Sequence, residues 1–166
     1  MTPAQSHLAL RPFADGDIDM LTTWLNQDYI LRWYHNPEDW LFEINQRHVT
    51  FAWIHHFIVM HENAPIGFCQ YYDCYEANDM EDWYDVPRRN DTFSIDYLIG
   101  NAIYLGKGFG KAIVALLTET IRQNEHARQI IVQPAIDNYA SNHVLMANGY
   151  VYDGEKAYYC KALTSP

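Results

Sequence analysis

The hydrophobic positions of this chain follow two periods, one typical of strands and the other typical of helices. The predicted strands cover residues 7–13, 57–61, 66–72, 92–100 and 129–134, and a last hairpin follows in the tail. The predicted helices cover residues 15–26, 29–42 in two pieces bent at Asn36 and Pro37, 111–124 and 138–147. Strands and helices that alternate in this way indicate one α/β domain over residues 1–166.

A glycine-rich segment, Leu105–Gly110, lies directly before the 111–124 helix. The first N–H groups of a helix have no partner within it, and together with the helix dipole they bind phosphate groups. Glycine has no Cβ and therefore lets the backbone come close to such a group. The segment has neither the Walker pattern nor the GxGxxG dinucleotide pattern, which disfavours kinases and Rossmann-type dehydrogenases. The sequence thus predicts a pyrophosphate-binding loop of another kind.

The charge of the chain is strongly negative, at −10 from 21 acidic and 11 basic residues. Nucleic acid is therefore not an expected partner, because its phosphates require clustered lysine and arginine. About half of the net charge lies in residues 73–91, which hold seven acidic residues and two arginines around Trp83 and Tyr84. Such a segment either binds a polycation through carboxylates and ring faces or is a solvated loop.

Nothing in the sequence indicates a metal site, a disulfide framework or a membrane anchor. The three cysteines, Cys69, Cys74 and Cys160, show no CxxC spacing, and the eight histidines form no HExxH pattern. No apolar run reaches the roughly 20 residues that span a bilayer, and the first residues lack a signal-peptide pattern. We therefore expect a cytoplasmic protein with reduced thiols, no metal and no membrane partner.

Two patterns and the order of elements resemble the GNAT superfamily of N-acetyltransferases. The family loop, Arg/Gln-x-x-Gly-x-Gly/Ala, corresponds to Leu105–Gly110, with a leucine in the leading position. The second pattern, Asn-x-x-Ala-x-x-x-Tyr-x-x-x-Gly-Phe, corresponds in spacing to Asn138, Ser141, Leu145, Gly149 and Tyr150. The resemblance covers nearly the whole chain and implies a mixed, centrally splayed β-sheet flanked by helices.

Within the superfamily, the span Ile66–Gly110 is most similar to the aminoglycoside 6'-N-acetyltransferases. This resemblance implies acetyl-CoA as the acetyl donor, a small cationic amine as the acceptor and a possible homodimer. It also implies that the donor contacts one strand, the glycine loop and the start of the 138–147 helix. The residues concerned are Tyr97, Leu98, Ile99, Leu105, Gly106, Lys107, Gly108, Phe109, Gly110, Lys111, Asn138 and Ser141.

Asp96, on the 92–100 strand, is the predicted catalytic residue. A carboxylate in a partly buried cleft can orient the acceptor ammonium and accept its proton, and a backbone N–H near Leu98 can stabilise the oxyanion. The alternative is a structural aspartate bonded to a loop backbone or to Arg88. The residues predicted to bind the acceptor are Asp82, Trp83, Asp85, Asp96 and Trp33.

The catalytic acid and the acceptor stay open at this point. The usual family acid is the tyrosine of the second pattern, and Leu145 takes its place here. Tyr139, Tyr150 or water are the alternatives for protonating the thiolate. The same scaffold also serves protein N-termini, lysines and siderophore-precursor amines, and a non-catalytic acyl-CoA sensor is a further hypothesis.

Overall fold

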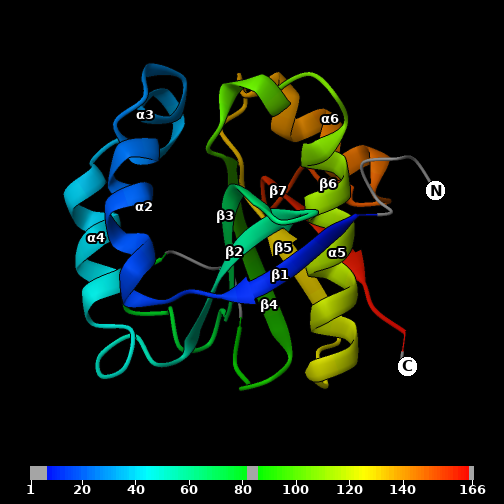
Figure 1. The fold of residues 1–166 in the computed structure, drawn as a ribbon. Helices are drawn as coiled ribbons and strands as arrows, with labels where there is room; N and C mark the ends of the chain where they lie inside the picture. The colour runs from blue at the N-terminus through cyan, green and yellow to red at the C-terminus, as the bar shows by residue number, and fades with distance from the viewer. Residues whose placement is uncertain (1–6, 82–85, 165–166) are drawn as a thin grey trace.

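The described residues form an open sheet of seven strands with helices on both faces (Figure 1). The computed structural model describes residues 7–81 and 86–164. The strands lie in the order β1-β2-β3-β4-β5-β7-β6, and all neighbours among them are antiparallel except β4 and β5. Their bounds are β1 Leu8–Pro12, β2 Ile54–His61, β3 Ala64–Asp73, β4 Thr92–Ile99, β5 Gln129–Val132, β6 Val151–Asp153 and β7 Tyr158–Ala162. The predicted mixed α/β fold is confirmed.

The helices form two groups on opposite faces of this sheet (Figure 1). One group is α2 (Ile18–Leu25), α3 (Asp28–Tyr34) and α4 (Pro37–Asn45); the other is α5 (Phe109–Asn124) and α6 (Tyr139–Ala147). Short 3₁₀ turns, η1 (Asp15–Asp17) and η2 (Ala102–Tyr104), precede α2 and the glycine loop. No helix in the described ranges has the length and apolar character to cross a membrane.

The predicted bend between α3 and α4 is confirmed and has a local cause. The side chain of Asn36 accepts a hydrogen bond from the Glu38 N–H at 3.1 Å, and Pro37 occupies the first helical position. A side-chain cap followed by proline is a strong helix start, because it satisfies one free N–H and removes another. Asn36 and Pro37 therefore fix the position at which α4 begins.

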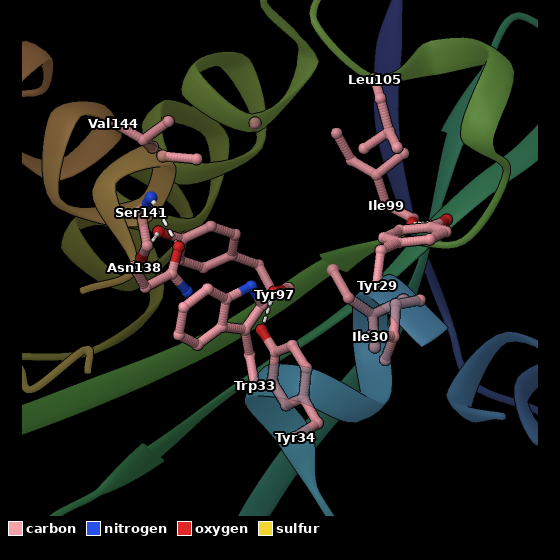
Figure 2. Close-up of a pocket in the computed structure, with 13 residues that line it drawn as sticks. Tyr29, Ile30, Trp33, Tyr34, Tyr97, Ile99, Leu105, Asn138, Ser141 and Val144 are labelled. Atoms are coloured by element: carbon pink, nitrogen blue, oxygen red, sulfur yellow. Dashed lines mark hydrogen bonds between the residues drawn. The ribbon is translucent and has the colours of Figure 1, made fainter. Parts of the chain in front are cut away.

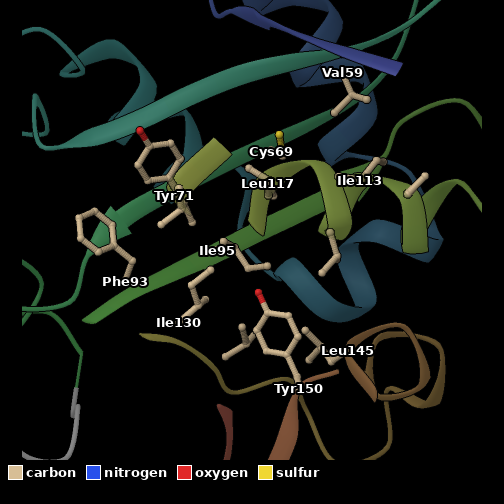
Figure 3. Packing of buried hydrophobic residues seen from close by; sticks show 14 of the residues in the cluster. Val59, Cys69, Tyr71, Phe93, Ile95, Ile113, Leu117, Ile130, Leu145 and Tyr150 are labelled. Atoms are coloured by element: carbon tan, nitrogen blue, oxygen red, sulfur yellow. The ribbon is translucent and has the colours of Figure 1, made fainter. Parts of the chain in front are cut away.

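Side chains of β4 alternate between the two helical layers, as the two-residue period of a strand requires. Phe93 and Ile95 pack with Ile113 and Leu117 of α5 in one buried cluster (Figure 3). Leu98 packs on the opposite face, in the cluster beneath α2, α3 and α4. Asp96 shares the face of Leu98, and Tyr97 shares the face of α5 and α6.

The sheet opens in its centre. The parallel strands β4 and β5 pair only at Thr92 with Gln129 and at Phe93 with Ile130. The rest of β5 continues to pair with β7, so the second half of β4 has no strand on that side. This gap is the predicted splay, and it leaves part of the β4 edge free for another partner.

Candidate functional site

A cleft lies beside the free edge of β4, between α3 on one side and α6 on the other (Figure 2). It encloses about 250 Å³. We call it the donor cleft; its lining residues are Tyr29, Ile30, Trp33, Tyr34, Tyr97, Leu98, Ile99, Leu105, Gly110, Asn138, Ala140, Ser141 and Val144. Most of this surface is apolar, which suits the burial of a slender organic chain.

Backbone groups of β4 supply the polar edge of the donor cleft. The Tyr34 hydroxyl donates to the Tyr97 carbonyl, and the Tyr29 hydroxyl donates to the Ile99 carbonyl at 2.7 Å (Figure 2). The N–H and C=O of one residue point to the same side of a strand, so the amides of Tyr97 and Ile99 also face the cleft. The backbone of Leu98 faces β3, where it pairs with Phe68. An oxyanion donor on this strand is therefore the N–H of Tyr97 or Ile99 rather than that of Leu98.

The glycine loop ends as an uncapped helix start. Gly106 and Gly108 adopt φ of 71° and 86°, a region that residues with a Cβ rarely adopt. Gly108 is the N-cap of α5, no side chain caps that end, and no acidic residue lies in the first turn. Lys107 and Lys111 are both exposed at this end. Free N–H groups, the helix dipole and two ammonium groups together favour an anion here.

Phe109 contributes only its backbone to that loop. Its ring is buried and packs against His61 and Tyr104, with ring centroids 5.0 and 5.2 Å away. Leu105 is 41% exposed at the mouth of the donor cleft. The leucine that replaces the family Arg or Gln therefore adds apolar surface to the cleft.

Asn138 and Ser141 face the donor cleft from α6, on the wall where the sequence placed them. The side chain of Asn138 accepts from the Ser141 N–H at 3.2 Å and so caps α6. The Ser141 hydroxyl lies 2.6 Å from the Tyr97 hydroxyl, across the cleft wall (Figure 2). Burial raises the pKa of Tyr97 to about 12, while the hydrogen bond with Ser141 opposes that rise. The Tyr97 hydroxyl is thus a neutral donor or acceptor at physiological pH.

Asp96 lies where two smaller hollows meet beyond the donor cleft. A junction hollow, bounded by Trp33, Tyr34, Tyr97 and Asn138, continues directly from the cleft and reaches Asp96. Asp96 also lines a second hollow on its other side. One of its carboxylate oxygens accepts a hydrogen bond from the Gln70 Nε2 at 2.9 Å. The side-chain partner of Asp96 is thus a residue of β3, where the sequence had suggested Arg88 or a loop backbone as the alternative.

Burial sets the acidity of Asp96. It raises the pKa of this carboxyl to about 6, against the lowering effect of the Gln70 hydrogen bond and with a further rise from the negative charge of Glu81. A carboxylate with this pKa is ionised at neutral pH, and a nearby cation would stabilise that charge.

The second hollow, which we call the acid hollow, is formed by Trp40, Glu43, Gln70, Tyr72, Glu81 and Asp96 together with four small or apolar neighbours. Its walls come from α4, β3, β4 and the segment after β3. Of the predicted acceptor residues, Trp33 lines the donor cleft and the junction hollow, and Asp96 lines the acid hollow. Asp82, Trp83 and Asp85 lie outside the described residues.

The acidic segment 73–91 has more than one role. Asp73 is buried and accepts from the backbone N–H groups of Tyr75 and Asn90, so it organises the turn. Glu76 forms an ion pair with Arg89 at 2.9 Å. These two carboxylates are structural, whereas Glu81 reaches the acid hollow.

The side chains considered for the catalytic acid are mostly remote from the cleft. Leu145 is fully buried in the core beneath α5 (Figure 3). The Tyr150 hydroxyl is buried and lies 2.8 Å from Thr118, and Tyr139 is 71% exposed and lines neither the cleft nor the hollows. Tyr97 also lines the cleft, and its hydroxyl is not bonded to a β4 carbonyl as those of Tyr29 and Tyr34 are. In the sequence, Tyr97 directly follows Asp96 on a predicted strand, so its side chain is expected on the opposite face. That position could have indicated Tyr97 as a candidate for the catalytic acid.

A free strand edge in a splayed sheet, a glycine loop at a helix start and a buried carboxylate beyond them define a class of protein, the CoA-dependent acyltransferases. The chain belongs to the acetyltransferase (GNAT) domain family, whose model matches residues 14–157. Members of this family use acetyl-CoA as the acetyl donor, and the chain is accordingly an acyltransferase.

Known relatives point to the same class. The chain is 26% identical over 144 residues to aminoglycoside N(6')-acetyltransferase type 1 of Klebsiella pneumoniae, and the aligned region covers 83% of this chain and 71% of the relative. The fold is shared with the aminoglycoside acetyltransferase AAC(6')-Ib in complex with coenzyme A and kanamycin, at 22% identity and a TM-score of 0.76 over 93% and 94% of the chains. It is also shared with spermidine N-acetyltransferase from Vibrio cholerae in complex with CoA and spermine, at 19% identity and a TM-score of 0.71 over 94% of this chain and 93% of the other.

Proposed function

We propose that this enzyme transfers the acetyl group of acetyl-CoA to a primary amine of a small polycationic acceptor, specifically the 6' amine of an aminoglycoside. The observation that carries the proposal is the position of Asp96, which lies between the end of the donor cleft and the acid hollow. The aminoglycosides named for the relatives support the class of acceptor. The residues assigned to each role below belong to this proposal.

The residues present fit acetyl-CoA as the donor. The free amides of Tyr97 and Ile99 suit the amide groups of the pantetheine arm, because they lack a strand partner. The uncapped start of α5, with Lys107 and Lys111, suits the pyrophosphate. When bound, acetyl-CoA supplies a thioester carbonyl that a neutral amine can attack.

The proton balance divides the work among these side chains. A C–N bond forms, the C–S bond breaks, the amine nitrogen loses one proton and the thiolate sulfur gains one. Asp96 orients the acceptor amine and accepts its proton, directly or through water. Tyr97 has a pKa of about 12, some 3 to 4 units above that of a thiol at about 8.5, so complete transfer of its proton is unfavourable. Tyr97 therefore stabilises the leaving sulfur by a hydrogen bond, and solvent supplies the proton.

Tyr97→Phe is expected to lower kcat about tenfold with little change in the KM for acetyl-CoA, because one hydrogen bond made in the transition state is lost. Steady-state kinetics at saturating acceptor measure the effect. Tyr139→Phe, which removes an exposed hydroxyl, is the matched control and should leave kcat unchanged. An unaltered kcat in Tyr97→Phe would exclude the hydroxyl from the reaction.

The experiment that tests the proposed function is release of free CoA from acetyl-CoA with four sets of amines. The sets are aminoglycosides, spermidine and related polyamines, lysine derivatives and N-terminal peptides. We expect rapid turnover with aminoglycosides. Turnover confined to lysine derivatives or peptides would overturn the acceptor assignment, and CoA binding without any turnover would favour the acyl-CoA sensor.

A cytoplasmic enzyme with this activity would protect its cell from aminoglycosides, and we include that role in the proposal. Expression in a susceptible strain and measurement of growth inhibition by kanamycin tests it directly. The homodimer stays a prediction.

A further inference from the structure

The acid hollow is lined by hydrogen-bond acceptors that have no donor of their own. The Oε1 atom of Gln70 is buried and has no hydrogen-bond partner, although its Nε2 donates to Asp96. Gln70 is only 2% exposed and lines the acid hollow, so its unpaired oxygen is shielded from bulk solvent. Glu43 of α4 and Glu81 at the rim add carboxylates to the same hollow. An unpaired buried acceptor destabilises a fold, so a donor is expected to meet it.

The indole N–H groups in the walls of the acid hollow already donate hydrogen bonds to backbone carbonyls. The Trp40 indole N–H donates to the Tyr34 carbonyl at 3.0 Å, and the Trp53 indole N–H donates to the Thr50 carbonyl at 3.1 Å. The hydroxyl of Tyr72 interacts with Ser94, which lies opposite Tyr72 on β4. The rings therefore present carbon surface, and their π faces attract a cation.

The charge of the hollow is also uncompensated. No lysine or arginine lines it among the residues that the structure describes. Burial, together with the negative charges of Asp96, Glu81 and Asp39, raises the pKa of Glu43 to about 7. No three acidic, histidine or cysteine side chains of residues 7–81 and 86–164 are grouped closely enough to hold a metal ion. An organic cation with several N–H donors satisfies this hollow better than a metal does.

The hollow is large enough for a small polar group. It encloses about 130 Å³, whereas one water molecule needs roughly 10–15 Å³. That space accepts an aminomethyl-sized group. Asp96 lies at one end, where the reacting amine is placed by the proposed function, so the remaining acceptors are free to bind a different amine of the same molecule.

We propose that Glu43, Glu81 and the free Gln70 Oε1 form a subsite for a second ammonium group of the acceptor, and that Glu43 determines specificity for acceptors carrying at least two amines. The inference rests on the proposed function and assigns the residues that bind a second amine of its polycationic acceptor. One primary ammonium offers three N–H donors, which matches two carboxylates and one amide oxygen.

The test compares Glu43→Gln with the wild-type enzyme on kanamycin and on a monoamine acceptor of the panel. Glutamine keeps the shape of glutamate and removes a charge from a partly buried site, so the variant should fold, which its melting temperature checks. We expect the KM for kanamycin to rise about tenfold, with kcat, the KM for acetyl-CoA and the KM for the monoamine unchanged. Glu38→Gln, the same change on an exposed residue of α4, is the control.

The pH profile gives a second readout. In the wild type, kcat/KM for kanamycin should rise with pH as Glu43 ionises near pH 7. This rise should be absent in Glu43→Gln. The rise that accompanies ionisation of Asp96 near pH 6 should be present in both proteins. The same KM for kanamycin in the wild type and in Glu43→Gln would overturn the subsite. An increase in KM for the monoamine as large as that for kanamycin would also overturn it.

Calorimetric titration of kanamycin and spermidine into the CoA-bound protein separates the two proposals. Weaker binding to Glu43→Gln supports the subsite even if no acetyl transfer occurs, in which case the proposed function alone fails. Transfer to polyamines with unchanged binding in the variant refutes the subsite and leaves the proposed function in place. Absence of polyamine binding to the wild type refutes the subsite.

Discussion

Replacement of Asp96 by asparagine is expected to lower kcat/KM for the acceptor by at least about 100-fold while leaving the affinity for acetyl-CoA unchanged. Asparagine retains an oxygen that can accept from the Gln70 Nε2, which donates to Asp96 at 2.9 Å in the wild type. It cannot accept the proton of the amine or balance an ammonium charge. CoA release at saturating acetyl-CoA measures the loss.

The control for this variant is Asp79→Asn, which removes one negative charge from an exposed residue of the acidic segment. It should retain activity within about twofold, since an exposed charge is largely screened by salt. A kcat/KM in Asp96→Asn equal to that of the wild type would remove Asp96 from the mechanism.

Asp96→Asn should also be more stable than the wild type above pH 6. The pKa of Asp96 is about 6 in the folded protein and has an ordinary value of 3.8, so the folded state binds this proton more tightly than the unfolded state. Ionisation therefore destabilises the fold progressively from about pH 4 to pH 6, by at most about 3 kcal/mol, and the penalty is constant above that range. Urea unfolding at pH 8 and pH 4 should show a gain at pH 8 that is absent at pH 4.

Gly108→Val is expected to weaken acetyl-CoA binding by at least about 100-fold. Gly108 has a φ of 86°, which is strained for a β-branched residue, and a Cβ at this position meets no protein atom within 4 Å. The variant can therefore fold with a local cost of about 1–3 kcal/mol. Its side chain would occupy the space through which a pyrophosphate approaches the start of α5. Calorimetric titration with CoA measures the loss.

Gly154→Val is the control, the same change at a glycine that lines neither the donor cleft nor the two hollows. Gly154 has no positive φ, and a Cβ there would meet no protein atom within 4 Å. This variant should bind CoA within a few-fold of the wild type. Wild-type affinity in Gly108→Val would show that the loop is not where the pyrophosphate binds.

The features predicted most completely from sequence are those set by neighbouring residues. Hydrophobic alternation located β4, and the glycine spacing located the start of α5, because both patterns act within a few residues. Asp96 was found as a charged residue in an otherwise apolar strand. The splay followed from the family resemblance, since short-range patterns do not report how far β4 and β5 pair.

The acid hollow escaped sequence reasoning because its parts come from distant segments. Glu43 lies one helical turn after Trp40, and that spacing places both on one face of α4, yet nothing local shows that this face meets β4. Gln70 is a polar residue in an otherwise apolar strand, and this pattern could have indicated a buried polar site. The sequence also did not show that Tyr97, and neither Tyr139 nor Tyr150, lines the donor cleft. That placement depends on how β4 packs against α6, which local patterns do not report.

The most direct test of acetyl transfer to an aminoglycoside is mass spectrometry of the product from a matched pair of acceptors. The pair differs only in an amine or a hydroxyl group at the 6' position. We expect one acetyl group, located at the 6' nitrogen, on the amine and no acetylated product from the hydroxyl compound. Acetylation of both compounds at another amine, or of neither, would contradict this expectation.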